Sequence, residues 1–143
     1  MMSTDTAMEI ADLEREIERL GHNAGYWQTM QTNAESKAQA MDTVAEQLAI
    51  HSNPLLTVFR PIENLHNVTT WEGDAATQSR TRLGTHIERV SDALAMIDGL
   101  ISDLEVEAGK AHSHASDAEG LANYYRTQLS YARGDLWTAR KSL

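Results

Sequence analysis

The sequence predicts an all-α protein, an elongated antiparallel helical hairpin of the coiled-coil type. Two long apolar seams with heptad spacing run through the two halves of the chain, where a seam is the line of residues that an amphipathic helix turns toward its partner. A Trp-x-Gly tripeptide lies between them, at the midpoint of the 143 residues. The two-residue period of a β-strand is found nowhere.

The first seam lies in the N-terminal half, and its spacings alternate between three and four residues. It contains Ile10, Leu13, Ile17, Leu20, Ala24, Trp27, Gln31, Ala34, Ala38, Met41, Ala45 and Leu48. The average period of 3.5 residues keeps one line of side chains facing a partner helix in a left-handed supercoil. This pattern predicts a first arm over about residues 5–50, capped by Ser3, Thr4 or Asp5.

The second seam has the same spacing and no polar member, and it predicts a second arm over about residues 74–141. It contains Leu83, Ile87, Val90, Leu94, Ile97, Ile101, Leu104, Ala108, Ala111, Ala115, Ala118, Ala122, Tyr125, Leu129, Ala132, Leu136, Ala139 and Leu143. A break between residues 108 and 120 is the alternative to one helix, because each glycine inside a helix costs about 1 kcal/mol relative to alanine. The seam keeps its phase across this segment, which favours the unbroken helix.

A helix-breaking proline, a short helical connection and a turn are expected between the arms. Pro54 lacks an amide hydrogen and disfavours helical geometry at Asn53, so the first arm should end near Ile50. Residues 54–68 then form the connection and residues 69–73 the turn, in which Gly73 lets the backbone bend tightly. The chain is thus one domain over residues 1–143. Antiparallel arms of equal rise that turn near residue 72 would place residue i opposite about residue 144 minus i.

Composition and charge argue against several classes of function. The net charge of -9, with a pI near 5.0, argues against binding to nucleic acid or to anionic membranes. No stretch approaches the roughly 20 apolar residues of a membrane span, and the N-terminus has no secretory signal pattern. The chain has no cysteine, hence no disulfide and no thiolate metal site.

We expect no catalytic residues, no cofactor, no metal and no small-molecule substrate. No nucleophile elbow, phosphate-binding loop or zinc-protease signature is found. His112 and His114 are two residues apart and point in nearly opposite directions on a helix, so a shared metal ion would require this segment to be a loop.

Trp71 and Gly73 between two amphipathic arms resemble the WXG superfamily of helical-hairpin proteins, which are exported by type VII secretion systems or act with them. The chain is most similar to the longer members that accompany LXG-type toxins. Family members often carry a Tyr-x-x-x-Asp/Glu signal after the second helix, and Tyr131 and Asp135 match that spacing. The phenol and the carboxylate would share one helical face. The chain departs from typical members in its greater length and in the extra segment 53–68.

The resemblance implies a non-catalytic, toxin-associated secretion adaptor, chaperone or co-secreted partner. Such a protein would bind the helical hairpin of a toxin's N-terminal region or of a related small protein, or form a homodimer, and would be recognised by the type VII machinery. It would be cytoplasmic before export, and export would not need a cleavable signal peptide. The alternative is a self-assembling coiled-coil scaffold unrelated to secretion.

Apolar residues off or beside the seams indicate where a partner would bind, because the opposite arm cannot cover all of them. The candidate interface residues are Phe59, Leu100, Leu121, Tyr124 and Trp137.

Overall fold

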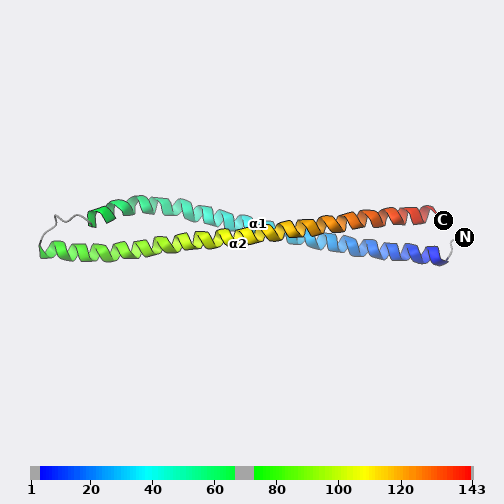
Figure 1. Ribbon diagram of the computed structural model, residues 1–143, viewed down its shortest axis with the longest axis horizontal. Coiled ribbons are helices and arrows are strands. Elements are labelled where there is room, and N and C mark those ends of the chain that lie inside the picture. Colours follow the sequence, from blue (N-terminus) through cyan, green and yellow to red (C-terminus); the bar gives the residue numbers. More distant parts are fainter. Residues whose placement is uncertain (1–3, 67–72, 143) are drawn as a thin grey trace. The chain divides into compact units, whose positions relative to one another are not determined.

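The computed structural model describes residues 4–66 and 73–142. Two helices fill these ranges, α1 (Thr4–His66) and α2 (Asp74–Lys141), and they pack against each other as an all-α helical hairpin (Figure 1). The predicted fold class is therefore confirmed. Trp71, which belongs to the predicted turn, lies outside the described residues.

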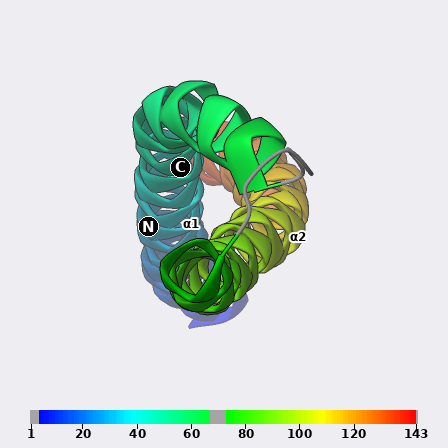
Figure 2. The same cartoon turned by 90° about the vertical axis from the view of Figure 1, so that its left-hand side faces the viewer.

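The hairpin divides into two compact units, each built from one segment of each helix. Unit 1 comprises Met1–Ala38 and Gly109–Leu143, and unit 2 comprises Gln39–Ala108. Figure 2 looks at the end that carries the last turns of α1 and the first turns of α2, both of which belong to unit 2.

The predicted seams form the core of both units. In unit 1, all the seam residues from Ile10 to Ala38 and from Ala111 to Ala139 are buried or partly buried. In unit 2 the same holds from Met41 to Leu48 and from Leu83 to Ala108, except that Val90 is 39% exposed. Among the described residues, no large side chain is completely buried. The core is therefore a single layer made largely of alanine and leucine.

Two side-chain hydrogen bonds establish the register of the helices in unit 1. Arg126 donates to Gln28 at 2.7 Å, and Arg140 donates to Glu14 at 2.8 Å. The residue numbers of each pair add to 154, so the helices are antiparallel and residue i lies opposite about residue 154 minus i. The predicted sum of 144 was wrong. In unit 2, the first turns of α2 extend past the end of α1 (Figure 1), so the hairpin is not symmetric about residue 72.

The predicted end of the first arm near Ile50 was also wrong. Helix α1 continues through Pro54 and Pro61 to His66, and it takes in most of the expected connection 54–68. The three-and-four spacing of the seam continues from Leu48 to Ser52 and Phe59, which are buried and partly buried, whereas Leu55 and Ile62 at the same spacing are exposed. Ser52 is buried, and its hydroxyl donates to the Ala49 carbonyl at 3.0 Å. Pairing with α2 thus outweighs the one hydrogen bond that a proline removes from a helix.

Helix α2 is unbroken between residues 108 and 120, as the phase of its seam indicates. It begins directly after Gly73, which has a φ of 97°. The Gly73 carbonyl accepts a hydrogen bond from the Thr77 amide at 3.0 Å and another from the Thr77 hydroxyl at 3.1 Å. Glycine suits this position, because residues with a side chain rarely tolerate this φ, while the predicted turn itself lies mostly outside the described residues.

Replacing Gly73 or Gly120 by alanine should have opposite effects on stability. Gly73→Ala places a Cβ on a left-handed backbone and should lower the free energy of unfolding by about 1–2 kcal/mol. Gly120→Ala is the matched control: it lies inside α2, where an added Cβ meets open space, and it should raise the free energy by about 0.5–1 kcal/mol. Denaturant titrations followed by circular dichroism measure both. Equal stability of the two variants would contradict the positive φ at Gly73.

Candidate functional site

The two flanks of unit 1, on either side of the seam, differ in chemistry. One flank carries the hydrogen bonds from Arg126 to Gln28 and from Arg140 to Glu14, and the second is also an ion pair. These contacts cross from α2 to α1 and make this flank polar. The other flank has an apolar groove between the helices, which we call the Trp27 groove.

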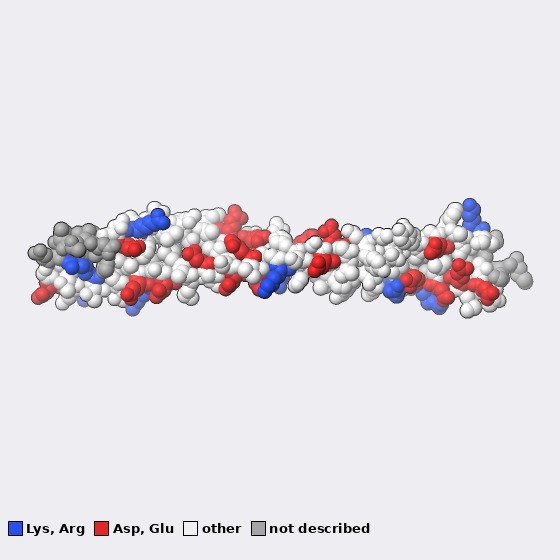
Figure 3. Space-filling model, in the orientation of Figure 1, with Lys and Arg blue, Asp and Glu red and all other residues white. Residues whose placement is uncertain are grey.

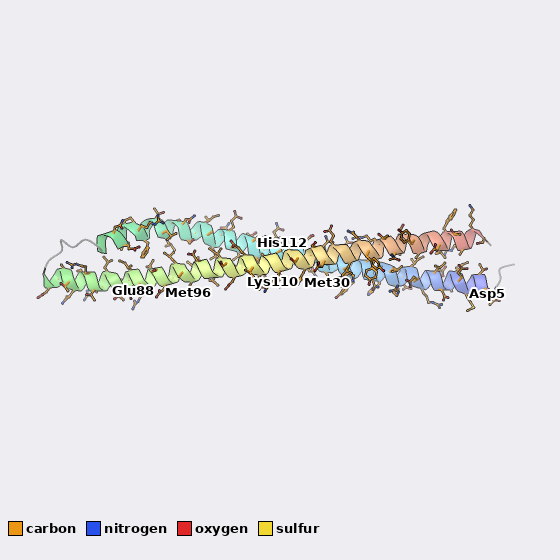
Figure 4. The ribbon with its side chains drawn as sticks, viewed as in Figure 1. Asp5, Met30, Glu88, Met96, Lys110 and His112 are labelled. Carbon is orange, nitrogen blue, oxygen red and sulfur yellow. The ribbon has the colours of Figure 1, made fainter. Side chains whose placement is uncertain are left out.

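The Trp27 groove has a volume of about 490 Å³, and both helices contribute to it. Its apolar part is formed by Trp27, Met30 and Ala34 of α1 and by Ala118 and Leu121 of α2. Met30 (Figure 4) is 42% exposed and Leu121 is 37% exposed, so both are accessible from solvent. The remaining lining residues are Asn33, Lys37, His114 and Asp117. The groove is therefore apolar with a charged end.

Side-chain size explains why a groove forms here. Trp27 is a large seam residue, whereas Ala34 and Ala118 are small, so the space beside the indole is not filled by the opposite helix. The Tyr26 ring meets Trp27 edge-on, at a centroid distance of 5.1 Å and an interplanar angle of 83°. Edge-to-face pairs stabilise aromatic side chains relative to each other. The indole is thus held in place beside an accessible apolar groove.

The predicted signal residues lie on the groove side of α2. Leu121, Tyr124, Tyr131 and Asp135 follow one another at spacings of three, seven and four residues, which keeps them on one face of the helix. Tyr124 is 56% exposed, Tyr131 is 64% exposed, and Asp135 is also exposed. Tyr131 and Asp135 are therefore accessible together on this face of α2.

The five candidate interface residues are divided between the two units. Leu121 and Tyr124 belong to the groove side of unit 1, whereas Leu100 and Phe59 belong to unit 2. Leu100 is 51% exposed, but Phe59 is partly buried on the continued seam. Trp137 is 63% exposed and carries the Lys141 ammonium 4.7 Å from its ring centroid. It lies six residues after Tyr131, about 240° around the helix, and so faces another direction.

Sequence reasoning missed the groove because it assigned Trp27 to the seam alone. Met30 and Leu121 each directly precede a seam residue, Gln31 and Ala122 respectively, and positions of this type flank the seam of a coiled coil. A large apolar residue at this position on both arms was the signal available in the sequence.

The described residues contain no group of three or more His, Asp or Glu side chains placed to hold a metal ion. His112 and His114 are both exposed on the continuous helix α2. Neither described helix contains a segment long and apolar enough to cross a lipid bilayer.

Of the two residues of the predicted turn motif, only Gly73 lies within the described residues, and it is exposed at the start of α2.

Comparisons with protein-family models, with curated proteins and with solved structures find no match to the chain.

An ion pair on α1 perturbs one carboxyl group of unit 1. The Arg19 guanidinium hydrogen-bonds to Glu16, with an Nε to Oε2 distance of 3.0 Å, and this bond lowers the pKa of the Glu16 carboxyl below its ordinary value. The same bond raises the pKa of Arg19. A carboxyl whose pKa is lowered on folding stabilises the fold above its unfolded pKa, and this contribution is lost as the pH falls through the folded pKa. Both side chains are solvent-exposed, so the effect on stability is small.

Arg19→Gln should raise the pKa of the Glu16 carboxyl, because it removes the charged donor that favours the carboxylate. An NMR titration of the Glu16 side chain between pH 2 and 7 measures the shift. Arg133→Gln, which lies on α2, is the control and should leave the Glu16 titration unchanged. The same Glu16 pKa in wild type and Arg19→Gln would show that the pair does not persist in solution.

Proposed function

We propose that the chain is a non-catalytic, WXG-like adaptor that binds a partner helical hairpin through the groove side of unit 1. The partner would be the N-terminal region of an LXG-type toxin or a related small helical protein. The chain would act as a secretion adaptor, chaperone or co-secreted partner of a type VII system.

The Trp27 groove is the observation that carries this proposal. An accessible apolar groove lined by Trp27, Met30 and Leu121 offers the kind of surface into which an amphipathic helix places its apolar residues. Tyr124 and Tyr131 extend it along α2, and exposed tyrosines are common in protein interfaces. The opposite flank is occupied by polar contacts between the helices. Unit 1 therefore has one flank suited to a helical partner.

The assignment to type VII secretion rests on the resemblance carried by Trp71, Gly73, Tyr131 and Asp135 and on the hairpin fold. In this proposal the protein resides in the cytoplasm before export, and the machinery reads Tyr131 and Asp135 on the accessible face of α2.

A self-assembling scaffold is the second candidate, and exposed apolar residues in both units favour it. Residues such as Val58 and Leu100 in unit 2 and Tyr124 in unit 1 could be covered by further copies of the chain. Light scattering coupled to size exclusion separates the candidates: a scaffold forms a large homo-oligomer alone, whereas an adaptor forms a defined complex only with its partner.

Leu121→Asn should weaken binding to the N-terminal helical region of a co-encoded LXG-type toxin by about tenfold or more. The variant replaces an apolar groove side chain, and burying a leucine contributes about 1.5–3 kcal/mol. Calorimetry on the co-expressed and purified components measures the change. Val106→Asn is the matched control, since Val106 is 59% exposed but belongs to unit 2. Unchanged binding by Leu121→Asn, or no binding by wild type, would refute this proposal.

Trp71→Ala should reduce export of the chain or its toxin while most of the helix content is retained. Residue 71 lies between the two helices in the sequence and is not a member of either seam. Export is measured as the amount of protein in the culture medium relative to cells, and helix content by circular dichroism. Export unchanged from wild type would argue against a WXG-type role, and a global loss of helix would make Trp71 a purely structural residue.

A further inference from the structure

Unit 2 carries most of the net negative charge of the chain. Its residues 39–108 include eleven acidic and four basic side chains, whereas unit 1 has ten and eight. The four basic residues are also unevenly placed, because residues 39–59 and 90–108 contain seven acidic side chains and neither Lys nor Arg. Figure 3 shows acidic side chains set among uncharged surface, with few basic ones, on the face that it presents.

The same two segments expose apolar side chains. Val44 is 49% and Val58 63% exposed on α1, and Met96 is 70% and Leu100 51% exposed on α2. Met96 projects from α2 into solvent (Figure 4). We call these four side chains, together with Asp92 and Asp103, the acidic apolar surface.

The heptad positions place this surface on one side of unit 2. Val44, Val58 and Leu100 each directly precede a seam residue, as Met30 and Leu121 do in unit 1. In unit 1, these positions of the two antiparallel helices line the same groove. The equivalent positions in unit 2 therefore also share one flank.

Acidic residues border the apolar side chains of α2 at both ends. Asp92, Met96, Leu100 and Asp103 follow one another at spacings of four, four and three residues, which keeps them on one helical face. Both aspartates are exposed. A ligand that covers Met96 and Leu100 must therefore approach two carboxylates.

The charge distribution determines which occupant fits. A second copy of the chain would bring another net charge of -9 against an already acidic unit, and like charges that meet across an interface oppose association. A helix with an apolar face and flanking Lys or Arg side chains would cover the apolar residues and neutralise the carboxylates. The aliphatic stems of Lys and Arg also pack on apolar surface while their charged ends reach acidic groups.

We propose that the acidic apolar surface of unit 2 binds a basic amphipathic helix of a partner protein. This binding site is separate from the Trp27 groove and does not depend on a role in secretion. Two interaction surfaces, one in each unit, would let one chain hold two helical segments of different charge.

A designed peptide of about 18 residues, five helical turns, tests the proposal on the full chain. The first peptide has leucines on one face and lysines on the other, and the second replaces each lysine by glutamate. The lysine peptide should bind at least about tenfold more tightly than the glutamate peptide, and added salt should weaken its binding. Fluorescence anisotropy of labelled peptides measures the affinities.

Val58→Asn and Leu100→Asn should each weaken binding of the lysine peptide by about fivefold or more, because each removes an apolar contact. Leu56→Asn is the matched control and should bind the peptide like wild type, because Leu56 is 37% exposed in unit 2 but directly follows a position with seam spacing, which places it on the other flank. Equal affinity for both peptides, or loss of binding in Leu56→Asn but not in Val58→Asn and Leu100→Asn, would overturn the proposal. It would also be overturned if the chain formed a homodimer that Val58→Asn and Leu100→Asn abolished.

Discussion

The pairing of two heptad seams is the interaction on which the rest of the structure depends. Each helix turns one line of side chains inward. In unit 1, alanine occupies much of that line on both helices, with Ala24 on α1 and Ala139 on α2 as examples. Alanine lets helices approach closely but removes little apolar area from water. The fold is therefore stabilised by many modest contacts along the seam rather than by a few large buried side chains.

A single inward line leaves both flanks of each unit available for other interactions. In unit 1, one flank is used for polar contacts such as the one between Arg126 and Gln28, and the other holds the Trp27 groove. The groove exists because a tryptophan is placed in a seam of small residues, so the same alanines that allow close pairing also leave space beside the indole. Core packing and the candidate binding site thus have a common origin.

The sequence predicted the seams and the continuity of α2, because both depend on local spacing along one helix. It did not predict the register, because a repeating seam does not determine how far one helix is displaced along the other, and the estimate of 144 assumed arms placed symmetrically about residue 72. The predicted break at Pro54 was wrong because the helix is also stabilised by the burial of Ser52 and Phe59, and this contribution exceeds the penalty of the proline. The Trp27 groove depends on residues of both helices, so it could be located only once their register was known.

The uneven charge of the two units gives the flanks different selectivity. Unit 1 has a net charge of -2 and unit 2 has -7, although both expose apolar side chains beside the same kind of seam. Apolar contact alone would not discriminate among amphipathic helices, because any leucine-rich face could cover Leu100 or Leu121. Like charges across an interface exclude wrong partners. The acidic excess of unit 2 therefore selects against acidic helices and favours basic ones.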